Sequence, residues 1–331
     1  MRRRPVILEP EARAAGLVSL WNAAAGREFP LDERLFLQQL RLDTDPRRCF
    51  AFVEPDGAIV AAALAKRAAR PGASGEVPDV GYLSWLVVRE SSRRQGLATA
   101  LIEEARAWLS PLGATRLRLG SDHYHLMPGR PLETGAGYDA LGAFAARQGF
   151  MPENVEYDLV CDLATTPPPP VPDRSGGRYD FRCYRSGERE AVLAFMRGNF
   201  PGRWSHEAAE ALDAGMRPED LMIAIDRQDG SVAGFSRIYD GYSTILGPGV
   251  YWRRLMGRKP GGLGPIGVDA AKRGAGLGLG LLSASVLELR SRGVEIMAID
   301  WTDLIDFYGK IGFKVWKRYE PMSAPLAHPT L

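Results

Sequence analysis

The sequence contains few of the residues that several common kinds of site require. Only three of its 331 residues are cysteines and only four are histidines. The cysteines, Cys49, Cys161 and Cys183, are odd in number and far apart, so neither a disulfide framework nor a zinc site is predicted. The formal net charge is +2 and the basic residues do not form runs, which gives no reason to expect a nucleic-acid partner.

Long apolar runs are also missing. The basic start of the chain is followed by Pro5–Pro10, which is too short and too interrupted for the core of a signal peptide. No later run approaches the length of a membrane span. We therefore expect a cytoplasmic protein with no membrane partner.

Prolines and glycines gather in one stretch, which divides the chain. Residues 164–178 include four consecutive prolines, Pro167 to Pro170, and a glycine pair, a composition typical of an extended linker. The chain is longer than one compact domain usually is. We therefore predict an N-terminal domain over residues 1–163 and a C-terminal domain over residues 179–331.

The same order of elements is predicted in both halves. Each half has a strand, two helices and a hairpin, then a longer strand, a glycine-containing turn and a helix, and finally a strand, a helix and a last strand. Gly57, Gly96 and Gly149 match Gly230, Gly276 and Gly312 in order, so we interpret the halves as tandem copies of one fold. The predicted strands span residues 6–8, 49–53, 59–64, 80–88, 116–119 and 155–161 in the first copy, and 179–183, 221–225, 232–239, 264–268, 295–300 and 314–319 in the second.

The most informative stretch is the glycine-rich turn within residues 264–278. It follows a predicted strand and precedes an apolar helical run, so its backbone N–H groups lie at a helix N-terminus, where the positive potential favours a phosphate. No G-x-x-x-x-G-K-[ST] is present, and the alternating glycines of residues 274–280 do not give G-x-G-x-x-G, which excludes the P-loop and disfavours a dinucleotide turn there. The spacing is R-x-x-G-x-G, carried by Arg273, Gly276 and Gly278.

This turn resembles the coenzyme A pyrophosphate loop of the GNAT superfamily of acyl-CoA-dependent N-acyltransferases. The family usually carries Y-x-x-x-G-F on its next helix, and the chain has Tyr308, Gly312 and Phe313. The first copy repeats the loop as R-x-x-G-x-A, at Arg93, Gly96 and Ala98. The resemblance implies an α/β (α+β) chain of two tandem GNAT domains, each a mixed, mostly antiparallel sheet flanked by helices, in an arrangement similar to that of mycothiol synthase.

The resemblance also implies acetyl-CoA as cosubstrate and no metal. In the family, two neighbouring parallel strands separate and the pantetheine arm lies between them, so an N–H near Val268 would polarise the thioester carbonyl. The implied coenzyme-binding residues of the second copy are Ile266, Gly267, Val268, Arg273, Gly274, Ala275, Gly276, Leu277 and Gly278. Those of the first copy are Leu86, Val87, Val88, Arg93, Arg94, Gln95, Gly96, Leu97 and Ala98.

Acyl transfer needs an acid for the departing thiolate and a base for the amine proton. The resemblance gives Tyr308 the role of acid, since a phenol can pass its proton to a developing thiolate; the alternative is a tyrosine packed under the last strand. The matching position in the first copy is Ala145, so we expect that copy to bind coenzyme without turnover or to serve as scaffold. Asp300 is the first candidate for the base and Asp240 the second, with a loop or capping role as the alternative for each.

Two irregular stretches fit no family pattern. Residues 120–131 contain His123 and His125 and suit a role in substrate recognition or between domains; a histidine pair without further ligands is more typical of a loop than of a metal site. Residues 239–260 contain aromatic and arginine side chains that suit an acceptor pocket or a domain interface.

We therefore expect an acetyl-CoA-dependent N-acetyltransferase that acts on a small-molecule or peptide amine, with its active site in the C-terminal domain. Two alternatives stay open: a non-catalytic acyl-CoA-binding or sensing protein, and an enzyme similar to mycothiol synthase that acts on a cysteinyl amine. An acid at Tyr308 and none at Ala145 favours catalysis, because a protein that only binds needs no acid in one copy. Neither the acceptor nor the oligomeric state follows from the sequence.

Overall fold

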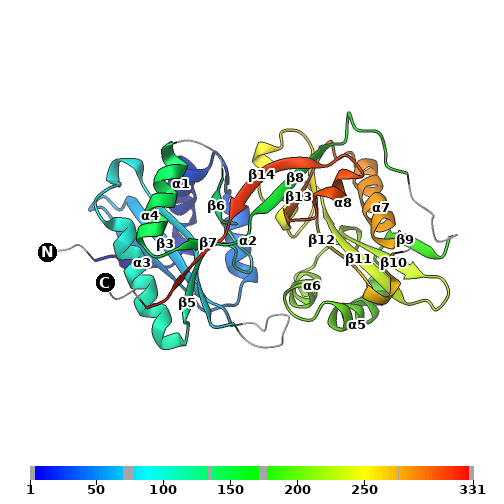
Figure 1. Cartoon of the computed structure of the whole chain (residues 1–331), viewed down its shortest axis with the longest axis horizontal. Coiled ribbons are helices and arrows are strands. Elements are labelled where there is room, and N and C mark those ends of the chain that lie inside the picture. Colours follow the sequence, from blue (N-terminus) through cyan, green and yellow to red (C-terminus); the bar gives the residue numbers. More distant parts are fainter. Residues whose placement is uncertain (1–3, 70–77, 133–135, 171–176, 275, 328–331) are drawn as a thin grey trace. The chain divides into compact units, whose positions relative to one another are not determined.

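The computed structural model describes residues 4–69, 78–132, 136–170, 177–274 and 276–327 (Figure 1). The chain forms two compact units. Unit 1 comprises residues 1–70, 77–156 and 318–331, and unit 2 comprises residues 71–76 and 157–317. Only the described residues of each unit are discussed below.

Unit 1 contains a seven-stranded sheet. In spatial order its strands are β1 (Val6–Leu8), β2 (Arg47–Val53), β3 (Ile59–Arg67), β4 (Val80–Val88), β5 (Arg116–Leu119), β15 (Met322–Pro325) and β7 (Met151–Pro152). Strands β4 and β5 are parallel, and the other pairings are antiparallel. Its helices are α1 (Ala14–Ala25), α2 (Glu33–Leu42), α3 (Leu97–Leu109) and α4 (Ala136–Arg147), of which α1 and α3 pack against β3 and β4.

Unit 2 is built on a second sheet. In spatial order its strands are β14 (Lys314–Glu320), β8 (Glu156–Asp162), β13 (Ile296–Thr302), β12 (Pro260–Val268), β11 (Val232–Tyr239), β10 (Leu221–Asp226) and β9 (Tyr179–Cys183). Strands β12 and β13 are parallel. The last residues of β14 lie in unit 1, where Tyr319 and Glu320 pair with the short β6 (Arg130–Pro131).

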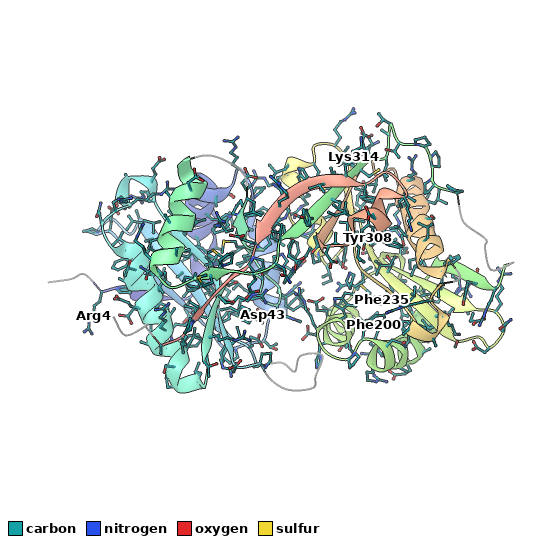
Figure 2. The ribbon with its side chains drawn as sticks, in the orientation of Figure 1. Arg4, Asp43, Phe200, Phe235, Tyr308 and Lys314 are labelled. Carbon is teal, nitrogen blue, oxygen red and sulfur yellow. The ribbon has the colours of Figure 1, made fainter. Side chains whose placement is uncertain are left out.

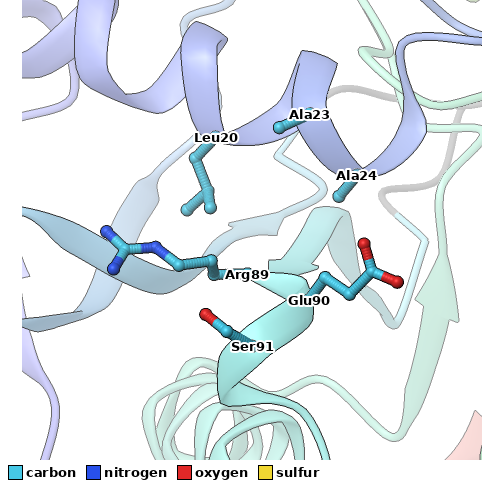
Figure 3. Close-up of a pocket in the computed structure, with 6 residues that line it drawn as sticks. All are labelled: Leu20, Ala23, Ala24, Arg89, Glu90 and Ser91. Carbon is cyan, nitrogen blue, oxygen red and sulfur yellow. The ribbon is translucent and has the colours of Figure 1, made fainter.

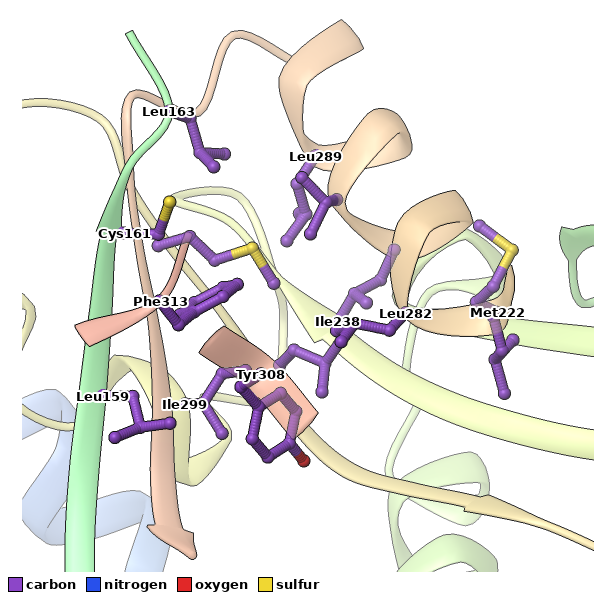
Figure 4. Packing of buried hydrophobic residues seen from close by; sticks show 14 of the residues in the cluster. Leu159, Cys161, Leu163, Met222, Ile238, Leu282, Leu289, Ile299, Tyr308 and Phe313 are labelled. Carbon is purple, nitrogen blue, oxygen red and sulfur yellow. The ribbon is translucent and has the colours of Figure 1, made fainter. Parts of the chain in front are cut away.

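The helices of unit 2 cover both faces of its sheet. They are α5 (Arg189–Asn199), α6 (Arg203–Asp213), α7 (Leu277–Ser291) and α8 (Ile305–Gly309). Figure 1 shows α7 on one side of the sheet and α5 and α6 on the other. The side chains that α7 buries, among them Leu281, Leu282 and Leu289, join those of β8, β13 and α8 in one apolar core (Figure 4). On the other side, Phe200 and Phe235 pack edge to face, with ring centres 5.4 Å apart (Figure 2).

The predicted fold class is confirmed, since both sheets are mixed and flanked by helices. Five strands, β1, β4, β5, β9 and β11, have the predicted limits. One prediction is wrong: residues 314–319 were expected to form the final strand, yet β15 follows and pairs in the sheet of unit 1. The last predicted strand of the first half, 155–161, forms β8 and pairs with β13 in unit 2. Strand propensity reflects how residues fit a half-buried pleated surface, so it identifies strands without indicating their partners.

Candidate active site

Both predicted coenzyme turns have the same backbone conformation. In unit 2, Arg273 is extended and Gly274 and Gly276 have φ of 88° and 78°; in unit 1 the corresponding Arg93 is extended and Arg94 and Gly96 have φ of 63° and 79°. Gly276 and Gly96 are the N-caps of α7 and α3, and neither has a side chain to satisfy the first N–H groups of its helix. These N–H groups suit a phosphate. The predicted site residue Ala275 lies outside the described residues.

At Arg94, the turn of unit 1 has a backbone conformation that is unfavourable for any residue except glycine. A non-glycine residue in the left-handed region costs about 1–3 kcal/mol, and the surrounding structure must hold it there. The glycine that occupies this position in unit 2 carries no such cost. The first copy therefore retains the conformation of the turn despite a sequence that opposes it.

The strand before each turn parts from its parallel neighbour. The pairing of β12 with β13 ends at Leu263 and Ile299, and that of β4 with β5 ends at Leu83 and Leu119. In unit 2, the N–H of Asp269 donates to Ala233 on β11. Because successive residues of a strand point to opposite edges, the N–H groups of Val268 and Ile266 face the edge where β13 has moved away.

A cavity of about 840 Å³ lies beside the turn of unit 1. Its lining includes eight of the nine predicted coenzyme residues of the first copy: Leu86, Val87, Val88, Arg93, Arg94, Gly96, Leu97 and Ala98. Only Gln95, which is exposed, does not contribute. The volume falls within the range of small-molecule sites. A second cavity of about 370 Å³ lies between α1 and residues 89–91, which precede the turn (Figure 3).

In unit 2, the predicted coenzyme strand lies under an aromatic cluster. A Cβ on Gly267 would lie 2.4 Å from the ring of Phe200, so only glycine fits there. Phe200 also packs against Trp204 and Phe235. The cluster joins the start of α6 to the strands beside the gap.

Asp300 lies where β12 and β13 separate. Its Oδ1 is 2.8 Å from the position that a Cβ on Gly264 would take, and it is half-buried. Its carboxyl accepts a hydrogen bond from its own backbone N–H, and among the described residues it forms no ion pair. Burial raises the pKa of Asp300 well above its usual range, the charge of Asp158 adds to this rise, and Arg203 opposes it. The site thus holds a carboxyl that binds a proton more strongly than an exposed aspartate does.

Tyr308 is buried, with 5% of its surface exposed, and its ring belongs to the apolar core. It packs edge to face against Phe307 and Phe313, with centres 5.0 Å and 6.2 Å away. Figure 4 shows its hydroxyl pointing away from Phe313 and Cys161. Burial raises the pKa of this phenol, and the charge of Asp300 adds to the rise. The phenol therefore stays protonated at neutral pH.

A β-bulge in β13 sets the direction of the Asp300 side chain. Ile299 pairs with Leu159 and Thr302 pairs with Tyr157, so Asp300 and Trp301 together lie opposite the single residue Asp158. Trp301 has a φ of 43°, unusual for a bulky residue. Its N–H donates to Asp158 Oδ1 over 3.1 Å, and Trp252 Nε1 donates to Oδ2 over 3.1 Å.

The first turn of α6 brings one cation to this place. The guanidinium of Arg203 lies 4.9 Å from the ring centre of Trp301, and its Nε donates to Glu207 over 2.8 Å. Burial alone would lower the pKa of Arg203, but Glu207 and other acidic neighbours, including Asp300, raise it. The cluster is thus a mixture of carboxyls and a fixed positive charge.

In unit 1, a buried cluster of side chains around Lys66 occupies the place that corresponds to the Asp300 site of unit 2. The matching registers of β3 with β4 and of β11 with β12 align Lys66 with Tyr239 and Ser84 with Gly264. Lys66 Nζ lies 2.5 Å from Asp43 Oδ2, also pairs with Asp122, and donates to the carbonyl of His123 over 3.0 Å. Burial alone would lower the pKa of Lys66, but Asp122 and Asp43 outweigh it and raise the pKa. This ammonium is therefore protonated.

Ala145 occupies the place of Tyr308 in unit 1. Phe150 donates its N–H to the Ala145 carbonyl over 3.0 Å, and Phe313 donates to the Tyr308 carbonyl over 3.4 Å, so the two positions correspond. Ala145 lines the large cavity. No phenol is available there.

The remaining predicted candidates have structural partners. Asp240 pairs with Arg217 over 3.0 Å and with Arg292 over 3.1 Å, which favours a structural role over that of a base. Thr302 Oγ1 accepts the N–H of Leu304 over 3.0 Å, beside the start of α8. In the stretch 120–131, Asp122 also accepts from Ser84 over 2.9 Å. Among residues 239–260, Tyr242 is exposed whereas Trp252 is buried against the bulge.

Sequence reasoning missed Asp158, Arg203 and Glu207. Asp158 is one of three acidic residues in β8, with Glu156 and Asp162, and nothing in the sequence shows that it is the buried one. Arg203 and Glu207 have the spacing of an ordinary surface ion pair on a helix, so nothing in the sequence distinguishes them.

Within the described ranges, no three or more His, Cys, Asp or Glu side chains gather so as to hold a metal ion. In the same part of the chain, no helix is long and apolar enough to cross a membrane.

The chain is similar to curated proteins and solved structures. It is 26% identical over 283 residues to a mycothiol acetyltransferase of Thermobifida fusca, covering 81% of this chain and 80% of that protein. It is 27% identical over 330 residues to a mycothiol acetyltransferase of Catenulispora acidiphila, covering 92% of each chain. A tandem GNAT protein from the clavulanic acid biosynthesis pathway superposes with a TM-score of 0.70 at 17% identity, covering 99% of each chain.

A higher TM-score, 0.84 at 24% identity, is found with a fungal multi-domain β-N-acetylglucosaminidase that has a glucosamine N-acetyltransferase region. That match covers 96% of this chain but only 38% of the fungal protein. The family model described as "Acetyltransferase (GNAT) family" matches twice, at residues 15–126 and 189–313. The chain therefore belongs to the acetyltransferase (GNAT) family and is an N-acetyltransferase, which transfers an acetyl group to an amine.

Proposed function

We propose that acetyl transfer takes place in unit 2, with acetyl-CoA as the donor, Asp300 as the base and Tyr308 as the acid. The observation that carries this proposal is the Asp300 carboxyl, half-buried where β12 and β13 separate and without an ion pair among the described residues. Buried carboxylates are normally paired with a cation, so a carboxyl without an ion pair beside a gap between strands supports a functional role at this position.

The raised pKa of Asp300 supports the role of base. A carboxyl with a raised pKa is a stronger proton acceptor, and it takes the proton that the amine must lose. Only the carboxylate can accept, so activity is lost as the pH falls through the pKa of Asp300. The amine nitrogen forms its bond to the acetyl carbon, and the bond from that carbon to sulfur breaks.

Tyr308 supplies the proton for the departing sulfur. Burial keeps the phenol protonated, which is the form that an acid needs. The same burial makes it a weaker acid than an exposed tyrosine, so it donates only to a strongly basic group such as a thiolate. Acetyl-CoA provides the acetyl group and the thiolate; the chain provides the proton acceptor and donor.

Unit 1 is proposed to hold coenzyme without turnover. Its cavity contains the turn, the strand before it and Ala145 in place of an acid. The Lys66 ammonium, held by Asp43 and Asp122, is fixed where unit 2 has Tyr239, beside the position of an acceptor amine. A protonated lysine is not nucleophilic, so it fills this place without reacting.

The acceptor is proposed to be a small-molecule or peptide amine. A cysteinyl amine is the second candidate, because relatives that match most of the chain are named mycothiol acetyltransferases. The three cysteines are free thiols, which supports a reducing cytoplasm as the place of action.

The test is a screen of amines in which release of free coenzyme thiol is measured with wild type and Asp300→Asn. Loss of the base lowers turnover by about 10²- to 10⁴-fold. Asp303→Asn, an exposed carboxyl three residues further along, is the matched control and keeps wild-type turnover. An Asp300→Asn variant that turns over at the wild-type rate contradicts the assignment of Asp300.

A further inference from the structure

Asp158 is buried, with 1% of its surface exposed, in the middle of β8. Its two carboxyl oxygens have different tasks. Oδ1 accepts the backbone N–H of Trp301, and Oδ2 accepts the indole N–H of Trp252. Hydrogen bonds to a charged acceptor are roughly twice as strong as those between neutral groups. One side chain therefore ties the end of β13 to the segment that precedes β12.

The bond to Trp301 holds a strained part of the backbone. Two residues of β13, Asp300 and Trp301, lie opposite Asp158, and Trp301 is in the left-handed region. Such a conformation persists only where the surroundings hold it. The corresponding Ser121 of unit 1 is also in the left-handed region, with a φ of 60°. The direction of the Asp300 side chain depends on the bulge in β13, because a bulge sets which way its residues face.

Five titratable or charged groups face Asp300 from the surrounding elements: Asp158 on β8, Arg203 and Glu207 on α6, Tyr239 on β11 and Tyr308 on α8. The charges of Asp158 and Glu207 raise the pKa of Asp300, whereas the charge of Arg203 lowers it. Among these neighbours, Asp158 contributes the largest rise in the pKa. It is also the one that bonds to the backbone beside Asp300.

We infer that Asp158 is a positioning residue for the reaction: it holds the bulge that directs Asp300 into the gap between β12 and β13. Its negative charge, which faces Asp300, also raises the pKa of that carboxyl. The inference rests on the proposed role of Asp300 as base. It goes beyond that role because it attributes the orientation and the raised pKa of Asp300 to Asp158, which precedes the proline-rich stretch in the sequence. Asp158 does not touch the reacting atoms; it acts through Asp300.

The test compares the pH profiles of kcat/KM for wild type and Asp158→Asn, using the best amine found in the screen. Removing the like charge lowers the pKa of Asp300, so the acid limb of the profile moves to lower pH. The base also becomes weaker and less well held, so the maximal rate falls on the order of tenfold, short of the 10²- to 10⁴-fold typical of losing a base. Coenzyme affinity, measured by calorimetry, stays at its wild-type value.

Trp252→Phe is the matched control. It removes the donor to Oδ2 while leaving the Asp158 charge and the bond to Trp301, so its acid limb stays where the wild type has it. If Asp158→Asn does not fold, Asp158→Ser replaces it, since serine also lacks the charge and the same shift is expected. Failure of both variants to fold would make Asp158 a structural residue and overturn the inference.

Asp300→Asn is measured in parallel so that the two ideas can fail separately. If Asp300→Asn retains wild-type activity, the proposed base is wrong. If Asp300→Asn is inactive and the acid limb of Asp158→Asn is unshifted, the base stands and Asp158 has no positioning role. An acid limb at lower pH in Asp158→Asn but not in Trp252→Phe supports the inference.

Discussion

Tyr308 shows how one residue can belong to the core and still be available for chemistry. Its ring contributes to the apolar cluster that joins α8 to β13, whereas its hydroxyl points out of that cluster. A structural tyrosine and a catalytic one therefore have the same burial, and they differ only in what the hydroxyl does.

We expect Tyr308→Phe to lower the rate of acetyl transfer far more than it lowers coenzyme affinity. The phenol contributes when charge develops on the sulfur, so its loss appears in turnover, by about 10²- to 10⁴-fold. The measurement is kcat by thiol release together with the dissociation constant of acetyl-CoA by calorimetry.

Tyr184→Phe is the matched control for Tyr308→Phe. Tyr184 is buried in the same unit and its hydroxyl donates to the carbonyl of Ser186 over 3.1 Å. Its loss costs about 1 kcal/mol of stability and leaves turnover unchanged. Wild-type kcat in Tyr308→Phe at saturating coenzyme would transfer the protonation of the thiolate to solvent.

The two turns are the elements for which sequence and structure agree most closely. Their described residues have similar backbone dihedral angles although the second position of R-x-x-G is glycine in one turn and arginine in the other. Their roles are proposed to differ, because the turn of unit 2 serves catalysis and that of unit 1 only binding.

Gly276→Glu is expected to abolish turnover, whereas Gly96→Glu leaves turnover largely intact and lowers the number of coenzyme molecules bound per chain. A carboxylate in a phosphate site opposes the ligand by charge, and a side chain at positive φ adds strain. Thiol release measures the first effect and calorimetric stoichiometry the second.

Gly230→Glu and Gly57→Glu are the matched controls, one in each unit. Both glycines have positive φ in exposed hairpin turns with open space around them, so the substitutions bring the same strain without a phosphate site. Equal loss of turnover in folded Gly276→Glu and Gly96→Glu would mean that unit 1 takes a direct part in catalysis.

The strands around the site could be predicted, but the cluster beside the base could not. β4 and β11 have their predicted limits because both stretches are rich in apolar and aromatic residues and lie between turn signals. Asp158 and Asp300 are more than 140 positions apart in the sequence, and a bulge brings them together; neither pairing partner nor bulge is encoded in local pattern. The tandem repeat was visible because glycine marks the same left-handed positions in both copies.

Each unit takes a strand from beyond the predicted limits of its own half. β8 pairs with β13 in unit 2, although it precedes the proline-rich stretch. β15 pairs with β5 in unit 1, although it lies near the C-terminus. A boundary in the sequence at residues 164–178 is therefore not a boundary between sheets.

A fragment of residues 179–331 is expected not to unfold cooperatively, whereas a fragment of residues 155–331 is. The shorter fragment lacks β8, which lies between β13 and β14, so it exposes the edges of these two strands and loses the core side chains Leu159 and Cys161. Thermal unfolding followed by circular dichroism makes the comparison. A sharp transition of equal midpoint in both fragments would show that β8 is dispensable.

The exchange of strands also has a consequence for synthesis on the ribosome. The chain emerges from its N-terminus, yet the sheet of unit 1 has a place between β5 and β7 that β15, at residues 322–325, occupies. The sheet of unit 1 therefore lacks one interior strand until roughly 170 further residues have been translated. At 5–20 residues per second this takes on the order of ten seconds or more. During that interval the edge of β5 lacks its partner strand, and unpaired strand edges of this kind are prone to associate with other chains.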